Sequence, residues 1–146
     1  MTTTYEEATD EVLTLFKAAW DTTAYATLVD YQNLAPSGGV KLPPNAQSAW
    51  ARVTLRNILG NQASLTGALA TSRFDREGLL TVQVFVPAGE GLSEAYQLAK
   101  IVADAYEGVA SPNGVWFRNV RVNEIGEDGD FYQVNVLVDF SYSEIK

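Results

Sequence analysis

Residues 78–106 read GLLTVQVFVPAGEGLSEAYQLAKIVADAY, and this stretch decides the fold because it changes from a strand to a helix within a few residues. From Leu80 to Val86 the apolar residues alternate with Thr81, Gln83 and Phe85, which is typical of a strand that buries one face. The segment PAGEG then ends the strand, since proline removes a backbone donor and glycine opens the backbone to a turn. Beyond it the apolar residues recur three and four apart, as on one face of a helix: Leu92, Ala95, Tyr96, Ala99, Val102, Ala103 and Tyr106.

The ends of this helix carry their own signals. Ser93 or Gly91 is suited to cap its beginning, and Gly108 is suited to end it. We therefore expect a strand that leads into a helix folded back on the sheet to which the strand belongs.

The length and composition predict one domain, residues 1–146, with a core that needs no disulfide or metal. Hydrophobic residues make up 47% and charged residues 19%, and no apolar run approaches the ~20 residues of a membrane helix. The first residues, Met1–Glu7, lack the basic and apolar regions of a signal peptide, so we expect the protein to remain in the cytoplasm where it is made.

The formal charge of -8 and the absence of His and Cys exclude several chemistries. Neither a Ser-His nor a Cys-His nucleophile pair can form, and zinc lacks its usual nitrogen and sulfur ligands. We expect no catalytic residues, no metal and no cofactor. The negative balance also predicts that DNA is repelled, because sequence-independent DNA binding needs Lys and Arg at the phosphates.

The remaining elements follow from capping, alternation and turn residues. Thr4–Glu7 has the spacing of a capping box and predicts the start of an N-terminal helix. The residues expected on its buried face are Tyr5, Ala8, Val12, Leu15, Phe16 and Ala19. Further strands are predicted at Ala24–Gln32, Trp50–Leu59, Val115–Ile125 and Tyr132–Tyr142, with a hairpin loop at Gly126–Asp130.

Two segments have no clean period. Asn33–Ala49 is rich in Pro and Gly and predicts a loop that projects from the domain as a contact arm. Gly60–Ser72 is small, polar and almost uncharged, and is interpreted as a second loop or a partly extended hairpin arm.

The order of these elements predicts an α+β fold, a mainly antiparallel β-sheet with two α-helices packed on one face, plus extended loop arms. The last strand is long and polar on one face, which suggests a sheet completed by neighbouring subunits.

Two alternatives concern a small-molecule or metal site. Asp75 and Glu77, with one of Glu124, Asp128 or Asp130, have the carboxylates for a metal-dependent enzyme. The favoured interpretation of RFDRE, residues 73–77, is a solvated strand edge, because Arg73 and Arg76 neutralise it. A ligand pocket lined by aromatic residues is the other alternative, although aromatics at these spacings more often belong to the core: Tyr96, Tyr106, Trp116 and Tyr142.

The chain resembles the small tail terminator and tail completion proteins of long-tailed bacteriophages. The resemblance lies in the order of segments: the N-terminal helix, the Pro/Gly-rich arm, WARVTL at Trp50–Leu55, LLTVQVFVPAGEGLSEAYQLAKIVADAY at Leu79–Tyr106, VWFRNVRV at Val115–Val122 and YQVNVLVDFSY at Tyr132–Tyr142. It implies a structural protein of the virion, assembled in the host cytoplasm and placed where the tail joins the head.

What the resemblance implies is a homo-oligomeric ring, typically a hexamer, that caps the tail tube, stops its polymerisation and offers a surface to the neck or connector protein. DNA would pass through the lumen without specific binding. A neck or head-completion ring would have the same physical properties and differ only in which surface binds which partner, so it remains an alternative.

Under the resemblance, both arms contact neighbouring subunits and four arginines pair with a neighbour's acidic residues. The predicted interface residues are Arg52, Arg56, Arg73, Arg76, Pro36, Gly38, Gly39, Pro43, Pro44, Leu65 and Leu69.

Overall fold

The computed structural model describes residues 2–34, 42, 44, 48–63 and 72–146. Within this part the two helices are α1 (Tyr5–Trp20) and α2 (Ser93–Asp104). The strands are β1 (Val29–Tyr31), β2 (Trp50–Gln62), β3 (Arg73–Pro87), β4 (Trp116–Asp128) and β5 (Phe131–Ile145). They form one sheet in the order β1-β2-β3-β5-β4, in which β1 is parallel to β2 and the other pairs are antiparallel.

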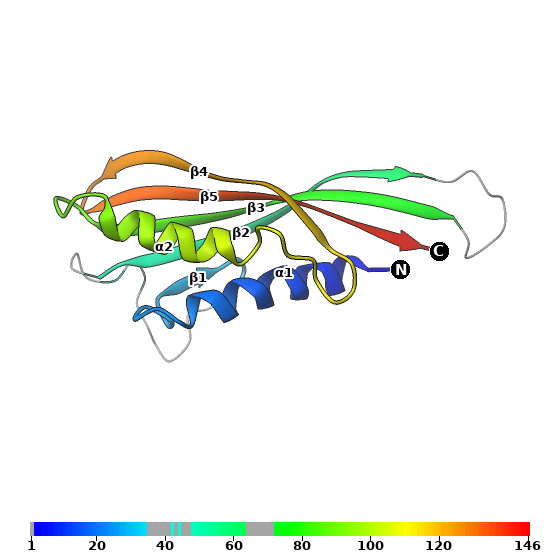
Figure 1. Cartoon of the computed structure of the whole chain (residues 1–146), viewed down its shortest axis with the longest axis horizontal. Coiled ribbons are helices and arrows are strands. Elements are labelled where there is room, and N and C mark those ends of the chain that lie inside the picture. The colour runs from blue at the N-terminus through cyan, green and yellow to red at the C-terminus, as the bar shows by residue number, and fades with distance from the viewer. Residues whose placement is uncertain (1, 35–41, 43, 45–47, 64–71) are drawn as a thin grey trace.

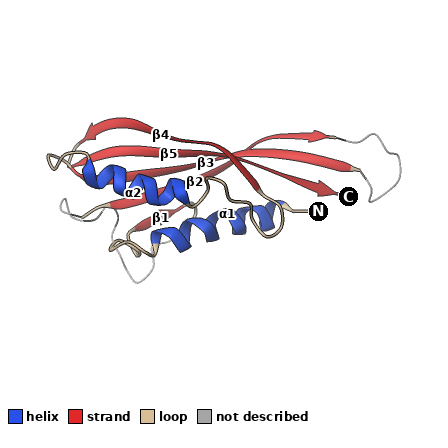
Figure 2. Cartoon of the chain, in the orientation of Figure 1, coloured by secondary structure: helices blue, strands red, loops and turns tan. Residues whose placement is uncertain are grey.

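Both helices lie on the same side of this sheet, as Figures 1 and 2 show. The predicted α+β fold, mainly antiparallel with two helices on one face, is confirmed. The other face of the sheet carries no helix of the described part, and we call it the open face.

The stretch 78–106 folds as its periodicity predicts. Leu80, Val82 and Val84 on β3 are completely buried, and α2 buries one stripe against them. The helix begins differently from the expectation, however. Leu92 occupies the N-cap and no side chain caps the helix, so neither Ser93 nor Gly91 has the expected role.

The N-terminal helix begins at its capping box. Thr4 Oγ1 accepts a hydrogen bond from the backbone N–H of Glu7 at 3.3 Å. Val12 and Phe16 are buried as predicted, and Trp20 is buried as well. Tyr5, at the beginning of the helix, is half exposed, and its ring packs edge-on against Tyr142 of β5 and lies 4.5 Å from the guanidinium of Arg76 on β3.

The strand predicted at Ala24–Gln32 is much shorter in the structure. Only Val29–Tyr31 pairs with β2, and residues 21–27 form turns. Trp20 Nε1 donates to the carbonyl of Tyr25 at 2.8 Å, which holds these turns against the end of α1. Among the described residues no strand pairs with residues 21–27, so the alternation of apolar residues did not by itself produce a strand there.

The strands of the long hairpin extend further than predicted. β2 continues to Gln62, into the segment interpreted as a loop or partly extended arm, and residues 64–71 of that segment lie outside the described part. β3 begins at Arg73, so RFDRE is strand and its Arg76 is buried, which corrects the interpretation of a solvated edge. The turn between β4 and β5 is likewise tighter than Gly126–Asp130, because pairing continues to Asp128 and Phe131.

Among the described residues, neither helix combines the length and the apolar character required to cross a membrane.

Candidate interaction surface

The open face carries five of the six arginines of the chain, and four of them are paired there with carboxylates. Residues in one cross-strand row point to the same side of a sheet, so the alternation that buries Val82 and Val84 places Gln83 and its row on the open face. The ion pairs are Arg52–Asp30 at 3.1 Å, Arg73–Asp75 at 2.9 Å, Arg118–Glu77 at 2.8 Å and Arg121–Asp139 at 3.6 Å.

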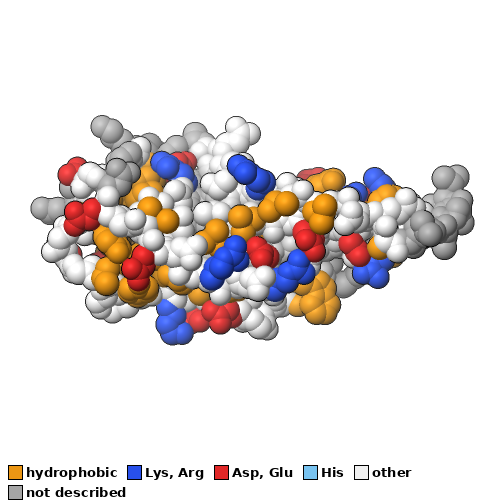
Figure 3. Space-filling model, turned by 90° about the horizontal axis from the view of Figure 1, so that it is seen from above, with side chains coloured by type: hydrophobic (Ala, Val, Ile, Leu, Met, Phe, Trp, Pro, Cys, Tyr) orange, Lys and Arg blue, Asp and Glu red, His pale blue; other side chains and the backbone are white. Residues whose placement is uncertain are grey.

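These pairs give the surface an intermixed charge. In Figure 3, Lys or Arg side chains lie beside Asp or Glu side chains along the length of the molecule, with hydrophobic side chains between them. The side chains of the pairs are roughly one third to one half exposed, apart from Asp139 at 28%. Exposed ion pairs contribute little to the stability of the fold, so their main effect is on the specificity with which this face binds another surface.

A second hydrophobic cluster lies on the open face at the β1 end of the sheet. Trp50 stacks on Phe85 with ring centroids 4.2 Å apart, and Phe131 packs edge-on against both. The guanidinium of Arg52 lies 5.2 Å from the Trp50 ring, and Leu42 packs against the cluster. One residue of the arm predicted to project is therefore folded back on the sheet.

At the opposite end, the hairpin of β2 and β3 is tied to the two termini. Arg76 Nη2 lies 2.7 Å from Glu144 Oε1, and the guanidinium lies 4.5 Å from the Tyr5 ring. The Nε of Arg76 is buried and has no hydrogen-bond partner among the described residues. Such a buried cation depends on its one carboxylate, because desolvation is costly without a counter-charge.

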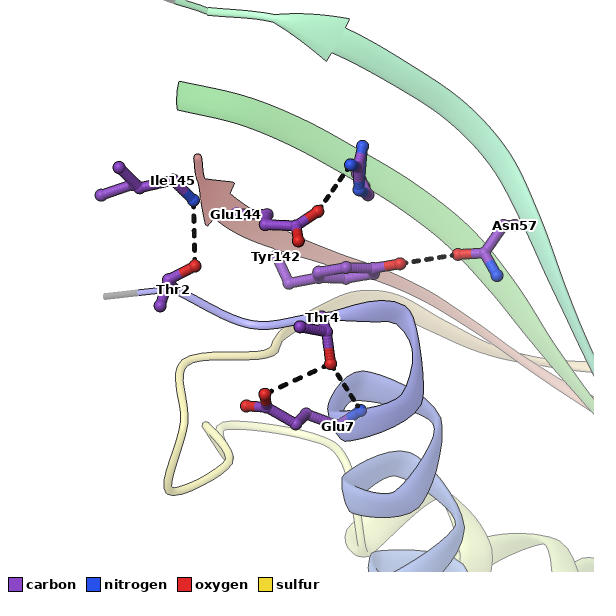
Figure 4. A network of polar contacts seen from close by, with 8 residues as sticks. Thr2, Thr4, Glu7, Asn57, Tyr142, Glu144 and Ile145 are labelled. Atoms are coloured by element: carbon purple, nitrogen blue, oxygen red, sulfur yellow. Dashed lines mark hydrogen bonds and ion pairs between the residues drawn. The ribbon is translucent and has the colours of Figure 1, made fainter. Parts of the chain in front are cut away.

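Figure 4 shows the contacts around this ion pair. The hydroxyl of Tyr142 donates to Asn57 Oδ1 at 2.9 Å, and the backbone N–H of Ile145 donates to Thr2 Oγ1 at 3.0 Å. The backbone N–H of Thr3 donates to the carbonyl of Ser143 at 2.8 Å. The N-terminal residues thus cover the end of β5, which extends beyond the last β4 partner, Trp116 opposite Ser141.

The structure gives partners within the chain to three of the four arginines predicted at an interface. Arg52 pairs with Asp30, Arg73 with Asp75, and Arg76 with Glu144. Arg56 is exposed and has no ion pair or hydrogen bond among the described residues. Pairing of these arginines with a neighbour stays a prediction, and Arg56 is the one whose charge is available for it.

The other predicted interface residues lie mostly outside the described part. Pro44 is described and half-buried. Those that lie outside are Pro36, Gly38, Gly39, Pro43, Leu65 and Leu69.

The carboxylates considered for a metal do not come together. Glu77 is opposite Ser141 on β5 and Glu124 is opposite Val134, so seven residues, or roughly 24 Å of strand, separate them. Asp75 accepts from Ser143 Oγ at 2.7 Å, and this bond together with Arg73 lowers the pKa of its carboxyl. No group of three or more potential metal ligands occurs among the described residues.

The aromatic residues considered for a pocket are also dispersed. Tyr106 and Tyr142 are buried, whereas Tyr96 is 37% exposed and Trp116 is 67% exposed. Two open depressions, of about 490 and 270 Å³, flank Trp116 and share Arg73 and Ser143 in their walls. The sequence interpretation missed this exposure, because apolar residues on both parities of VWFRNVRVNEI favour a strand covered on both faces.

The comparison with known proteins rests on structure, because the sequence matches no protein-family model and no curated protein. Several solved structures have a similar fold, and two of them cover nearly the whole chain. One superposes with a TM-score of 0.63 and 16% identity, over 95% of this chain and 96% of its own. The other is in the virion of native gene transfer agent (GTA) particle, with a TM-score of 0.51 and 16% identity, over 90% of this chain and 91% of its own.

The second structure is a virion component. At 16% identity the likeness shows a shared fold, and it extends over nearly the whole length of both chains in each comparison.

Proposed function

We propose that this chain is a structural protein of a phage-like virion and that it forms the terminator ring at the head-proximal end of the tail. The observation that carries the proposal is the fold shared over 90% of the chain with a component of a gene transfer agent virion. The order of segments that resembles tail terminators supports the finer assignment.

The surface of the molecule is suited to such a role. Carboxylates on the open face pair with arginines of the same face, which leaves a polar surface with little net charge. The remaining acidic residues of a chain with charge -8 make the molecule as a whole repel DNA. A homo-hexamer of such subunits would let DNA pass without binding it, and would meet the tail tube protein on one side and the neck or connector protein on the other.

The coarse part of the proposal is tested by locating the protein. An antibody against the chain, used for gold labelling of purified particles, should label one position between head and tail. Absence of the chain from purified particles, measured by mass spectrometry, would remove the virion assignment.

The finer part is tested by growth of the tail tube. Purified protein added to polymerising tube protein should stop elongation and should be seen as a ring at one end by electron microscopy. The neck alternative predicts a different result. A neck ring would bind only tails that are already capped, and the growth of uncapped tubes would remain unchanged.

A further inference from the structure

The sheet has a free strand edge on each side. On one side β1 pairs only with Ala51–Val53, and the Gln32 side chain accepts from the N–H of Leu55. The seven residues that follow on β2, Arg56–Gln62, are all exposed. On the other side β4 pairs with β5 alone, so its outer edge has no strand partner among the described residues.

Both free edges expose large apolar side chains. On β2, Ile58 is 62% exposed and Leu59 48%. On β4, Trp116, Val122 and Ile125 are 67%, 37% and 57% exposed. Proteins usually protect their sheet edges with charges, so apolar residues on two free edges indicate surfaces that are covered in an assembly.

The charges without partners differ in sign between the edges. Arg56 is the only charged residue of Arg56–Gln62, and nothing in the described part neutralises it. Glu124 and Glu127 on β4 are exposed and have no cation beside them in the described structure, whereas Arg118 and Arg121 are already paired with carboxylates. One edge therefore has an excess positive charge and the other an excess negative charge.

The strand directions also agree. The pairs β2·β3, β3·β5 and β5·β4 are all antiparallel, so β4 runs opposite to β2. A second copy placed beside the first in the same orientation brings its β4 antiparallel to the first copy's β2. Antiparallel pairing is the more favourable ladder.

We propose that the free β2 edge of one copy, Arg56–Gln62, pairs with the β4 edge of a second copy. The contact is head-to-tail, because two different edges meet, and contacts of this kind form rings when the rotation closes. Two bulges divide β4 into three regular parts, of which Arg121–Glu124 is the longest, and this limits the length over which the β2 edge can pair without interruption. The inference rests on the proposed ring and specifies its subunit contact.

The absence of cysteine from the chain makes this contact directly testable. Asn61→Cys is placed on the β2 edge and Asn123→Cys on the β4 edge, both at exposed positions. A mixture of the two single variants, treated with a short bis-maleimide, should give a covalent dimer, while each variant alone gives none. The double variant should give a ladder of covalent oligomers that ends at the ring size.

A matched control uses the helical layer. Gln97→Cys is exposed on α2, and mixed with Asn61→Cys it should give no dimer. A ring seen by native mass spectrometry without the Asn61–Asn123 cross-link would overturn this contact and leave the ring intact. A protein that stays monomeric at every concentration, without the cross-link, would overturn both the contact and the ring.

Discussion

Arg76 and Glu144 form a 2.7 Å ion pair in which the arginine side chain is 8% exposed and the glutamate side chain 17%. The pair joins the hairpin of β2 and β3 to the C-terminal strand, and the Tyr5 ring over the guanidinium joins both to α1. Three segments distant in sequence are thus held by one buried cation.

Removal of the Glu144 charge is therefore expected to destabilise the monomer. Glu144→Gln leaves the Arg76 cation buried without its counter-charge, which costs about 3 kcal/mol and lowers the melting temperature by ~10 °C. Differential scanning calorimetry measures the change. Asp104→Asn, which breaks the exposed Lys100–Asp104 pair on α2, is the control and should leave the melting temperature unchanged.

Gly78 is expected to tolerate no side chain. A Cβ there would overlap the Phe140 ring and lie 2.6 Å from the carbonyl oxygen of Arg56, so the strands would have to separate. Gly78→Ala should cost about 1–3 kcal/mol in urea unfolding, as overpacking of a core does. At Gly60 the nearest atom to an added Cβ is 3.6 Å away, so Gly60→Ala is a matched control with little effect. A Gly78→Ala variant as stable as the Gly60→Ala variant would contradict the close packing of Phe140.

Stability should fall in alkaline solution. Burial, followed by the neighbouring Tyr5, raises the pKa of Tyr142 to about 12, and burial raises the pKa of Tyr106 further. The unfolded chain ionises its tyrosines near pH ~10, so above that pH it binds fewer protons than the folded chain and unfolding is favoured. The contribution is complete below pH ~10 and is lost progressively toward pH ~12.

Tyr142→Phe should weaken this dependence of stability on pH. The measurement is the midpoint of urea unfolding at constant ionic strength from about pH 8 to 11.5, a range that includes the pKa of tyrosine in the unfolded chain. Tyr132→Phe, at a half-buried tyrosine of the same strand, serves as the comparison. Equal slopes for the wild type and the Tyr142→Phe variant would show that the buried hydroxyl does not carry the effect.

Two arginines of β2 should respond differently to charge reversal. Arg56→Glu is expected to weaken self-association about tenfold or more with little change in monomer stability, because Arg56 is exposed and unpaired within the described chain. Arg52→Glu should instead lower monomer stability, since Arg52 pairs with Asp30 and stacks on Trp50.

Sedimentation velocity and thermal unfolding separate the two effects of charge reversal. Lys100→Glu on α2 controls for the change in net charge. If Arg56→Glu and Lys100→Glu weaken association equally, the effect is one of total charge and the β2 edge has no special role.

The local part of the fold was available from the sequence. The alternation at Leu80–Val86 and the helical spacing that follows predicted β3 and α2, and Thr4 with Glu7 predicted the beginning of α1. These features depend on backbone geometry and on side chains a few residues apart, which a periodic pattern records directly.

The partners across the sheet were decided only by tertiary structure. Nothing near Arg76 in the sequence indicates Glu144, and no local pattern indicates that β5 inserts between β3 and β4. For the same reason RFDRE was interpreted as solvated, since its period could not reveal that β5 pairs beside it or that Tyr5 of α1 lies against Arg76.

The properties of the candidate interaction surface also come partly from the sequence and partly from the tertiary structure. The sequence by itself determined that the chain has neither His nor Cys, that its charge is -8, and that β2 carries two arginines with the same parity. Tertiary structure decided that Arg52 is neutralised by Asp30 while Arg56 is not, and that β4 lies at an edge with Trp116 exposed. The physical reason is that period shows which side chains share a face, whereas register and strand order, set by packing of distant segments, decide what each face meets.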